Sequence, residues 1–407
     1  MNQKKNRIML FCRNLSRVGG SEKLLFEEAA NFEKNDLDVQ ISTFYYCEDV
    51  LFNKNYNFKI DYHIYQEGTK SLFLKIIEEI QNVFFLRNKI KNSKPDIILA
   101  TSSWDCLSLY LATFATRFSY NTHIHGTIFW FQNSNLKYAL IHKKVFSKIR
   151  NSVIGHKEFI PLNPPKMGLM NRIVNEFHAL IMYLAVKKAK KIFVLSKQMK
   201  WEVNQLYGKD SIIVKGAFTD EILKYKPKKD IRKSLDLKGK RIILNLNRLD
   251  PRKRVDLLIK SFSEISNEFA DAVLLIGGTG PEEDKLKTLV RDLKIEDKVK
   301  FLGYVKEEDK WEYISACDVF AHPNWADFAI APFEALALRK KVVWSSEMEI
   351  DDEIRNTGLI FSAEPTVNKF AQTIKDALIT EISPKKYSLD NYTWGVYCQK
   401  VYEELIK

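Results

Sequence analysis

Residues 241–262 read RIILNLNRLDPRKRVDLLIKSF, and this stretch predicts three connected elements. The first six residues are mostly apolar, which predicts a buried strand. From Val255 onward, apolar residues recur every three or four positions, so a helix there would place Leu258 and Phe262 on one face. A cation-rich loop lies between the strand and the helix. A strand, a loop and a helix in this order are typical of an α/β protein.

The same alternation of apolar runs and helical patterns occurs on both sides of this stretch. Candidate strands before it are Arg7–Phe11, Val39–Phe44, Asp96–Ala100, Thr122–His125, Lys191–Leu195 and Ser211–Val214. Candidate strands after it are Ala272–Ile276, Val299–Leu302, Val319–Ala321, Val342–Trp344 and Gly358–Phe361. The pattern predicts parallel sheets covered by helices on both faces. Lys224–Lys240 is dense in lysine and is expected to be a linker or domain edge, so we expect two Rossmann-like domains.

The size and charge of the chain limit its class. A chain of 407 residues is long enough for two domains, and 45% hydrophobic with 28% charged residues is the composition of a soluble globular protein. With 64 Lys and Arg against 51 Asp and Glu, the net charge is +13, which favours an anionic partner over a neutral one. The five cysteines form no CxxC pair, so reduced cysteines in a cytosolic protein are expected. We find no sequence motif of a nucleic-acid-binding module, and nucleic acid is not expected as a partner.

No stretch predicts a membrane span. The longest uncharged apolar run, Phe177–Val186, is shorter than the roughly 20 residues that a spanning helix needs. The N-terminal apolar stretch is also too short for a signal peptide. Residues 128–178 mix aromatic and cationic side chains, and the sequence leaves two interpretations: a helical insertion packed on the first domain, or a surface that faces an acceptor or an anionic membrane. We expect a cytoplasmic protein. If residues 128–178 face an anionic membrane, the protein would also contact the inner face of that membrane peripherally.

The loop after the strand at 241–246 is the first candidate binding site. Arg248, Arg252, Lys253 and Arg254 fall within seven residues, at the point where a strand leads into a helix. Cations and free backbone N–H groups at such a point suit a diphosphate. A solvated turn is the alternative, and spacing alone does not decide between them.

Other candidate residues also stand where a strand ends. Gly277-Gly278-Thr279-Gly280 follows one strand, and Val18-Gly19-Gly20-Ser21 follows the first, where Ser21 could cap a helix. His123 and His125 alternate onto one face of a strand, so they could form a metal pair, although a single His125 that contacts substrate is the better interpretation. Further on, residues 328–331 lead into a helix with Glu334, whose carboxylate could accept hydrogen bonds from a ribose. The alternative is a glutamate that only complements the helix dipole.

In their order and spacing, these motifs resemble glycosyltransferase family 4, the retaining nucleotide-sugar enzymes with the GT-B fold. The resemblance is strongest from Arg241 to Phe361 and implies two Rossmann-like domains facing each other across a cleft. It divides the chain into an acceptor-side domain (1–218), a linker or edge (219–240), a nucleotide-sugar domain (241–385) and a C-terminal helix returning to the first domain (386–407).

The resemblance implies roles for individual residues. Arg248 and Lys253 match the family's diphosphate-binding cations, and His125 matches the histidine that positions the donor sugar. Glu334 matches the second carboxylate of the family's Glu-x7-Glu signature, which holds the ribose hydroxyls. The remaining donor-binding residues implied are Gly19, Gly20, Gly278, Gly280, Gly303, Tyr304, Asp327, Phe328, Ala329 and Ile330.

The chain departs from the family at the first carboxylate of that signature. Ala326 stands at this position, followed by Asp327, and Ala329 replaces a second glycine. Either Asp327 contacts the sugar instead, or the donor is unusual, or the site is inactive. The last possibility keeps a second function open, that of a non-catalytic GT-B subunit that binds nucleotide and supports a partner glycosyltransferase.

The mechanism implied needs no cofactor and no metal ion, because Arg248 and Lys253 would neutralise the leaving diphosphate. The chain would move a sugar from a nucleotide-diphosphate-sugar to a glycan or lipid-linked acceptor with retention of configuration. An epimerase and a phosphorylase on the same fold are rival enzymes, but the cofactor-lysine motif of a phosphorylase is not found in the sequence.

Overall fold

The computed structural model describes residues 6–16, 20–47, 58–64, 72–125, 135–152, 166–324, 329–348, 351–382 and 387–407. The chain divides into two compact units. Unit 1 contains residues 1–148, 163–216 and 394–407, and unit 2 contains residues 149–162 and 217–393.

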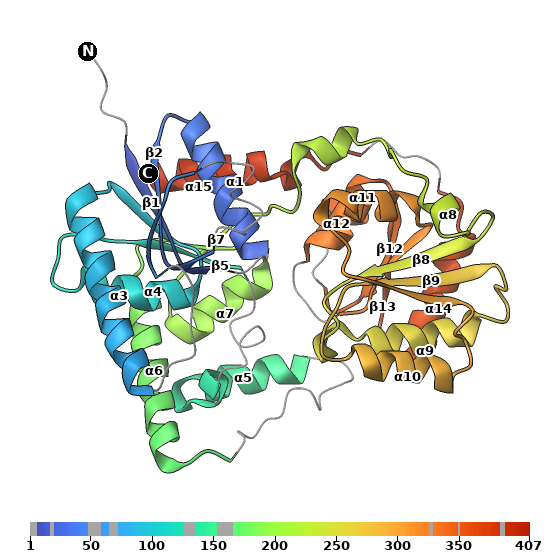
Figure 1. Ribbon diagram of the computed structural model, residues 1–407, viewed down its shortest axis with the longest axis horizontal. Coiled ribbons are helices and arrows are strands. Elements are labelled where there is room, and N and C mark those ends of the chain that lie inside the picture. Colours follow the sequence, from blue (N-terminus) through green and yellow to red (C-terminus); the bar gives the residue numbers. More distant parts are fainter. Residues whose placement is uncertain are drawn as a thin grey trace. The chain divides into compact units, whose positions relative to one another are not determined.

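Unit 1 is built on a seven-stranded parallel sheet with the strand order β3-β2-β1-β4-β5-β6-β7. Its strands are β1 (Arg7–Leu15), β2 (Asp38–Tyr46), β3 (Ile60–Ile64), β4 (Ile97–Ala100), β5 (Asn121–Ile124), β6 (Ile192–Val194) and β7 (Ile212–Ile213). Its helical segments are α1 (Gly20–Lys34), α3 (Leu72–Ser93), α4 (Ser103–Thr113), η1 (Asn135–Tyr138), most of α5 (Leu140–Ser152), α6 (Leu169–Lys188), α7 (Lys197–Tyr207) and α15 (Trp394–Ile406). Helices lie on both faces of this sheet (Figure 1).

The last helix of the chain belongs to unit 1. Helix α15 packs against α1, and its residues Tyr397, Cys398 and Val401 are buried. Gly216 permits close approach of the chain here, because a Cβ at this position would lie 2.8 Å from the Trp394 ring. The two ends of the sequence therefore share one core.

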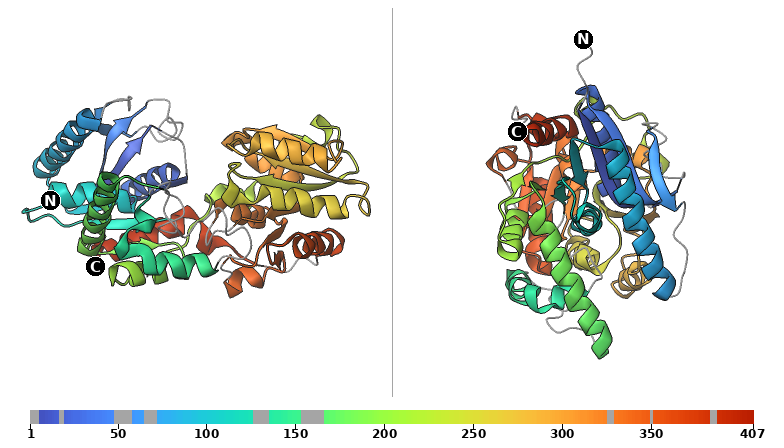
Figure 2. Two further views of the ribbon diagram at one scale, coloured as in Figure 1. Left: turned by 90° about the horizontal axis from the view of Figure 1, so that it is seen from below. Right: turned by 90° about the vertical axis from the view of Figure 1, so that its left-hand side faces the viewer.

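Unit 2 is built on a six-stranded parallel sheet with the order β10-β9-β8-β11-β12-β13. Its strands are β8 (Arg241–Leu246), β9 (Ala272–Gly277), β10 (Val299–Gly303), β11 (Val319–His322), β12 (Lys341–Ser345) and β13 (Ile360–Ala363). Its helical segments are η3 (Asp220–Lys224), α8 (Ile231–Ser234), η4 (Pro251–Lys253), α9 (Val255–Ile265), α10 (Glu283–Asp292), α11 (Glu307–Ala316), α12 (Ile330–Ala337), α13 (Asp352–Arg355), α14 (Val367–Ile379) and η5 (Asp390–Tyr392). Figure 2 shows the two units from two further directions.

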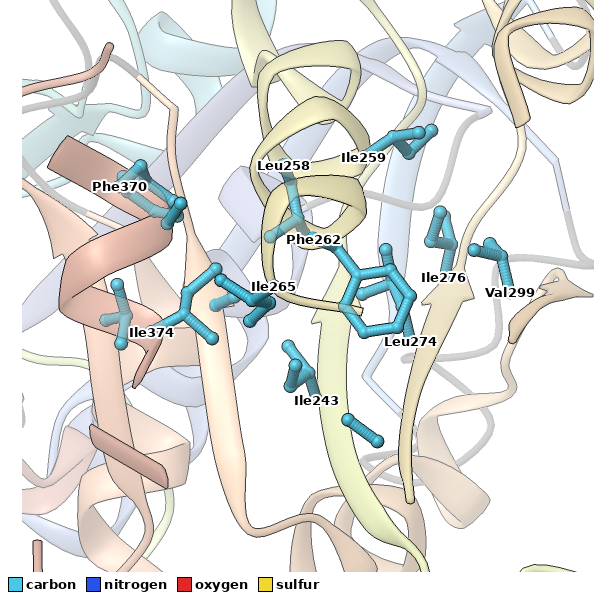
Figure 3. Packing of buried hydrophobic residues seen from close by; sticks show 14 of the residues in the cluster. Ile243, Leu258, Ile259, Phe262, Ile265, Leu274, Ile276, Val299, Phe370 and Ile374 are labelled. Atoms are coloured by element: carbon cyan, nitrogen blue, oxygen red, sulfur yellow. The ribbon is translucent and has the colours of Figure 1, made fainter. Parts of the chain in front are cut away.

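The sheet of unit 2 is buried on both faces, as the sequence pattern predicts. Alternate side chains of β8 enter different cores: Ile243 packs with α9 and α14, whereas Ile242 and Leu244 pack with the helices of the other face. Figure 3 shows the first of these cores, in which Phe262 and Phe370 face the sheet. Burial of both faces explains why the strands are continuous apolar runs rather than alternating ones.

The strand order fixes where a ligand is expected. In unit 2 the order reverses between β8 and β11, and in unit 1 between β1 and β4. In open α/β sheets, ligands bind outside the carboxyl ends of the strands at such a switch point. In unit 2, we therefore expect a ligand to bind at the loops after β8 and β11.

The sequence-based prediction of parallel α/β sheets is confirmed, with two differences in detail. Strand β3 was missed, because Ile60–Ile64 reads IDYHI and none of its residues is fully buried. The first helix begins at Gly20, so Ser21 lies inside it rather than before it. Residues 219–240 contain η3 and α8 and lie within unit 2.

Candidate active site

The loop after β8 presents two of the predicted catalytic cations at the switch point of unit 2. Arg248 is exposed, and Lys253 is partly buried at the end of η4. The pKa of Lys253 is lowered to about 7, chiefly by burial and also by repulsion from Arg252, with Asp250 acting in the opposite direction. A lysine in this condition regains its full charge when an anion binds beside it.

Backbone hydrogen bonds connect the loop that carries these cations, after β8, to the loops after β9 and β10. The backbone N–H of Asn247 donates to the carbonyl of Gly277 at 3.0 Å, and that of Leu249 donates to the carbonyl of Thr279 at 3.0 Å. The N–H of Gly278 donates in turn to the carbonyl of Gly303 at 2.7 Å. The position of Arg248 is thus set by the loops after β9 and β10.

The glycines of the second loop are needed for this packing. Gly278 has a φ of 127°, and a Cβ there would lie 1.8 Å from the carbonyl oxygen of Asn247. A Cβ at Gly280 would lie 2.3 Å from the carbonyl oxygen of Leu249. Close approach between two protein loops therefore explains both glycines, and contact between them and a donor stays a prediction. Gly303, with a φ of 66°, is the last residue of β10, and the exposed Tyr304 follows it.

A buried ion pair anchors the start of α9, immediately after Lys253. Arg254 has a left-handed backbone with a φ of 49°, and its side chain is fully buried. Its Nη1 donates to Oε2 of Glu347, and its Nη2 donates to Oε1 of the same carboxylate at 3.3 Å. Nη1 also lies 3.4 Å from the carbonyl oxygen of Pro323. The cation-rich loop is thereby linked to the residues that follow β11 and β12.

Glu334 lies on α12, and its side chain is only 1% exposed. Its Oε1 lies 2.8 Å from Nζ of Lys310 and accepts a hydrogen bond from Nε1 of Trp311 at 3.2 Å. Among the described residues, Oε2 has no hydrogen-bond partner. Burial lowers the pKa of Lys310, but attraction to Glu334 and Glu307 outweighs this and leaves the pKa raised. Glu334 therefore has contacts beyond a helix dipole, and its role in holding a ribose stays a prediction.

The end of β11 adds polar groups that the sequence analysis did not single out. His322 is buried, and the pKa of its imidazole is held well below its usual range by burial and by Lys253 and Arg252. Nδ1 of His322 lies 3.4 Å from Nδ2 of Asn247. Within the described part of the chain, Nε2 of His322 and both amide atoms of the fully buried Asn324 have no hydrogen-bond partner. Buried polar atoms in this condition are commonly satisfied by a ligand or by water.

His125 lies in unit 1, directly after β5. Its ring stacks on that of His123, with ring centroids 4.6 Å apart, as the predicted alternation requires. Nε2 of His125 lies 3.3 Å from the hydroxyl of Tyr397. Burial is the main cause that lowers the pKa of His125 to about 3, so its ring is neutral. The described residues hold no group of three His, Cys, Asp or Glu side chains suited to a metal ion.

Several predicted residues lie at the entry to a helix or outside the described residues. Ala329 precedes α12 and Ile330 is its first residue, while Gly20 is the first residue of α1. Gly19, Asp327 and Phe328 lie outside the described residues, as does Ala326.

The sequence could have indicated some of the missed residues. His322 and Asn324 follow a correctly predicted strand, so their place at the carboxyl edge of the sheet was derivable. Lys310 gives no such signal, because its contact with Glu334 depends on how α11 packs against α12.

Known proteins resemble this chain in sequence. Residues 227–394 match the family model described as Glycosyl transferases group 1. An uncharacterized glycosyltransferase of Methanocaldococcus jannaschii is 25% identical over 297 residues, which are 70% of this chain and 72% of that protein. The N-acetylgalactosamine-N,N'-diacetylbacillosaminyl-diphospho-undecaprenol 4-alpha-N-acetylgalactosaminyltransferase of Campylobacter jejuni is 29% identical over 265 residues, 62% of this chain and 69% of that one.

Solved structures show the same fold. A glycosyltransferase from Rickettsia africae superposes with a TM-score of 0.71 at 17% identity and covers 100% of both chains. The Anabaena protein HepE, solved with UDP and glucose, superposes with a TM-score of 0.65 at 16% identity, over 98% of this chain and 95% of that one. The chain therefore has the GT-B fold, and together with the sequence matches this supports a GT-B glycosyltransferase.

Proposed function

We propose that the chain is a retaining glycosyltransferase of family 4, which transfers a sugar from a nucleotide-diphosphate-sugar to a glycan or lipid-linked acceptor. The observation that carries this proposal is the carboxylate of Glu334. Lys310 and Trp311 hold one oxygen, and the other has no partner among the described residues. A ribose diol would supply the missing donor, and an open acceptor in a buried site costs about 1–3 kcal/mol until it is met.

The cations of the neighbouring loop suit the rest of such a donor. Arg248 and Lys253 would stabilise the charge that develops on the diphosphate as the glycosidic bond breaks. The acceptor hydroxyl would attack from the face that the diphosphate leaves, which retains the configuration. His125 would bind a hydroxyl of the donor sugar. In these roles Arg248 and Lys253 would take the place of a resident metal ion, so we expect the reaction to proceed without one.

Binding experiments test the two halves of the donor site separately. Glu334→Ala should weaken both a free nucleoside diphosphate and the intact nucleotide-sugar, because the ribose is common to them. Asp327→Ala should weaken only the nucleotide-sugar if Asp327 serves in place of the missing glutamate. Equal affinities in Glu334→Ala and the wild-type protein would contradict the proposed site. A wild-type protein that binds nucleotide but turns over no donor would favour the non-catalytic subunit.

The acceptor side has a surface suited to an anionic membrane, which we call the α5–α6 surface. Seven apolar side chains of α6 are between 40% and 77% exposed: Leu169, Met170, Ile173, Val174, Phe177, Leu180 and Leu184. Exposed cations accompany them on the two helices: Lys143, Lys144, Lys148, Arg172, Lys187 and Lys188. Glu176 is the one acidic residue of α5 and α6, and both its oxygens lie within 3.2 Å of the backbone N–H of Leu140.

The charge of this surface decides its occupant. A second copy of the chain would bring the same cations against the first set, whereas an anionic bilayer would neutralise them. Each Lys or Arg near such a bilayer contributes about 1 kcal/mol, and exposed apolar side chains can enter the headgroup region. None of the described helices is long and apolar enough to cross a membrane. We therefore propose peripheral contact at the cytoplasmic face, where a lipid-linked acceptor would be presented.

Vesicle sedimentation tests this contact. Binding to vesicles with an anionic lipid should exceed binding to neutral ones and should fall with salt. Phe177→Glu should weaken it, whereas Ile379→Glu, at a side chain 65% exposed in unit 2, should not. Equal binding to both kinds of vesicle would contradict the role of the cations.

A further inference from the structure

The loop after β11 in unit 2 holds a buried amide whose two polar atoms are both unpartnered. Asn324 stands two residues after His322, the last residue of β11, and it is fully buried. Neither Nδ2 nor Oδ1 of Asn324 has a hydrogen-bond partner among the described residues. Burial of an amide without hydrogen bonds costs free energy, so we expect this side chain to meet a partner from outside the chain.

The other buried asparagines of the described residues differ from Asn324 in this respect. In Asn245 on β8, for example, Nδ2 donates to the carbonyl of Ala321 at 2.7 Å. The fold thus supplies a partner where a buried amide is structural, and Asn324 is the exception. The buried asparagines whose side chains do have such a contact are Asn82, Asn121, Asn175 and Asn245.

Asn324 lies at the edge of the sheet where a ligand is expected, because the strand order reverses between β8 and β11. Nδ1 of His322 lies 3.4 Å from Nδ2 of Asn247, and its Nε2 is buried without a partner among the described residues. Burial and the charges of Lys253 and Arg252 hold the pKa of His322 well below its usual range, so the imidazole lies close to the cation-rich loop. Asn324, two residues further on, therefore adjoins the proposed diphosphate site.

The backbone before Asn324 is held by the buried side chain of Arg254. Nη1 of Arg254 lies 3.4 Å from the carbonyl oxygen of Pro323, and the guanidinium also pairs with Glu347. Because Arg254 directly follows Lys253, one residue connects the cation-rich loop to the residue that precedes Asn324. A group held in this way loses little conformational freedom when a ligand binds.

The chemistry of the amide limits the ligand. Nδ2 only donates hydrogen bonds and Oδ1 only accepts them. An ionised phosphate oxygen only accepts, so a diphosphate would leave Oδ1 of Asn324 unmet. A sugar hydroxyl both donates and accepts, so two neighbouring hydroxyls can satisfy both atoms of the amide.

We propose that Asn324 is a specificity-determining residue of the donor site, whose amide forms hydrogen bonds with two neighbouring hydroxyls of the transferred sugar. The proposal rests on the proposed function, which supplies the nucleotide-sugar as the ligand. It gives the sugar a polar contact in a chain that has Ala326 at the position of the first carboxylate of the family signature. This contact is separate from the one that Asp327→Ala tests.

Calorimetry on the full chain tests the contact. UDP is compared with UDP-glucose and with UDP-N-acetylgalactosamine, and GDP with GDP-mannose, so that the ratio of the two affinities in each pair measures the contribution of the sugar. Asn324→Leu keeps the shape of the side chain and removes both polar atoms. In at least one pair it should lower this ratio about tenfold and leave the affinity for the free nucleoside diphosphate unchanged. Unchanged ratios in all three pairs would overturn the proposal.

Deoxy analogues show whether the contact is direct. Among analogues of the best-bound nucleotide-sugar that each lack one hydroxyl, two with neighbouring positions should bind the wild-type protein more weakly than the parent. The same two should bind Asn324→Leu as well as the parent does, because the amide that these hydroxyls meet is already absent. Analogues that lose the same affinity in both proteins would show that Asn324 does not touch the sugar.

Urea denaturation without ligand supplies a second test. An apolar side chain of the same shape should leave the free protein at least as stable as the wild type, because Asn324 has no hydrogen bond to lose. Asn245→Leu is the matched control, since it removes the donor to the carbonyl of Ala321 and should lower the stability. A loss in Asn324→Leu as large as the loss in Asn245→Leu would show that the amide has a structural partner and would overturn the proposal.

Glu334→Ala separates this inference from the proposed function. If Glu334→Ala weakens binding of the free nucleoside diphosphate while Asn324→Leu leaves every sugar ratio unchanged, the inference fails and the donor site stands. If the wild-type protein binds no nucleoside diphosphate and no nucleotide-sugar, the proposed function fails, and the ligand assigned to Asn324 fails with it.

Discussion

Replacing Glu347 by alanine should destabilise the protein strongly through the loop that holds Lys253. The change leaves the fully buried Arg254 guanidinium without the carboxylate that receives two of its hydrogen bonds. Removal of one member of a buried pair typically costs about 3–5 kcal/mol, because an uncompensated charge remains in a medium of low polarity. The left-handed backbone of Arg254, with a φ of 49°, adds about 1–3 kcal/mol of strain that this pair now offsets.

Urea denaturation of the full chain, followed by far-ultraviolet circular dichroism, measures the change. We expect Glu347→Ala to lower the free energy of unfolding by about 3–5 kcal/mol. Glu283→Ala is the matched control. Oε1 of Glu283 lies 2.7 Å from Nζ of Lys287 on the surface of α10, and the side chains of Lys287 and Glu283 are 47% and 28% exposed. Loss of this exposed pair should lower the free energy of unfolding by less than about 1 kcal/mol.

A double variant tests whether the loss comes from the uncompensated charge. Arg254→Met combined with Glu347→Leu removes both charges and should restore most of the stability that Glu347→Ala loses. A Glu347→Ala protein within about 1 kcal/mol of the wild type would refute the reasoning, because that is the range of an exposed pair. So would a double variant as unstable as Glu347→Ala.

Two further predictions concern proton binding. Because the pKa of Lys253 is lowered to about 7, a nucleoside diphosphate should bind with uptake of up to one proton, and its affinity should fall as pH rises from 7 to 9. Calorimetry in two buffers of different ionisation enthalpy should detect this proton uptake in the wild-type protein and not in Lys253→Met. The folded-state pKa of Glu28 is about 8, above its usual value of 4.5, so the folded protein holds this proton more tightly and stability should fall as pH rises between these values, by up to about 1.4 kcal/mol per pH unit. Glu28→Gln should remove this fall in stability with pH, and the variant should be more stable than the wild type in urea denaturation at pH 9. An identical pH dependence of the free energy of unfolding in the two proteins would contradict the raised pKa of Glu28.

The apolar pattern predicted most strands because both faces of the two sheets are buried. Where burial is partial the pattern failed: β3 lies at the edge of its sheet, and its sequence IDYHI has no run of apolar residues. The glycines after β9 were recognised as allowing close approach, but the sequence did not show that Asn247 and Leu249 occupy the space beside them.

The candidate site was predictable only where it follows a strand. Arg248 and Lys253 in unit 2 and His125 in unit 1 were proposed because each follows a strand of its parallel sheet, and their roles stay predictions. Contacts between distant segments gave no sequence signal. Tyr397 meets His123 across 274 residues, and Lys310 meets Glu334 through the packing of two helices. Both contacts involve groups that the sequence identified only by type.

The most direct test of the account is turnover of nucleotide-sugars by the wild-type protein and by Lys253→Ala, in the presence of EDTA. Release of the nucleoside diphosphate from a panel of donors is measured with and without a lipid-linked acceptor, and the configuration of the new linkage is read by NMR. We predict release with at least one donor in EDTA, transfer with retention of configuration, and a rate about 10²–10³ lower in a folded Lys253→Ala protein. Strict dependence on a divalent ion, inversion of configuration, or undiminished turnover by Lys253→Ala would contradict the account.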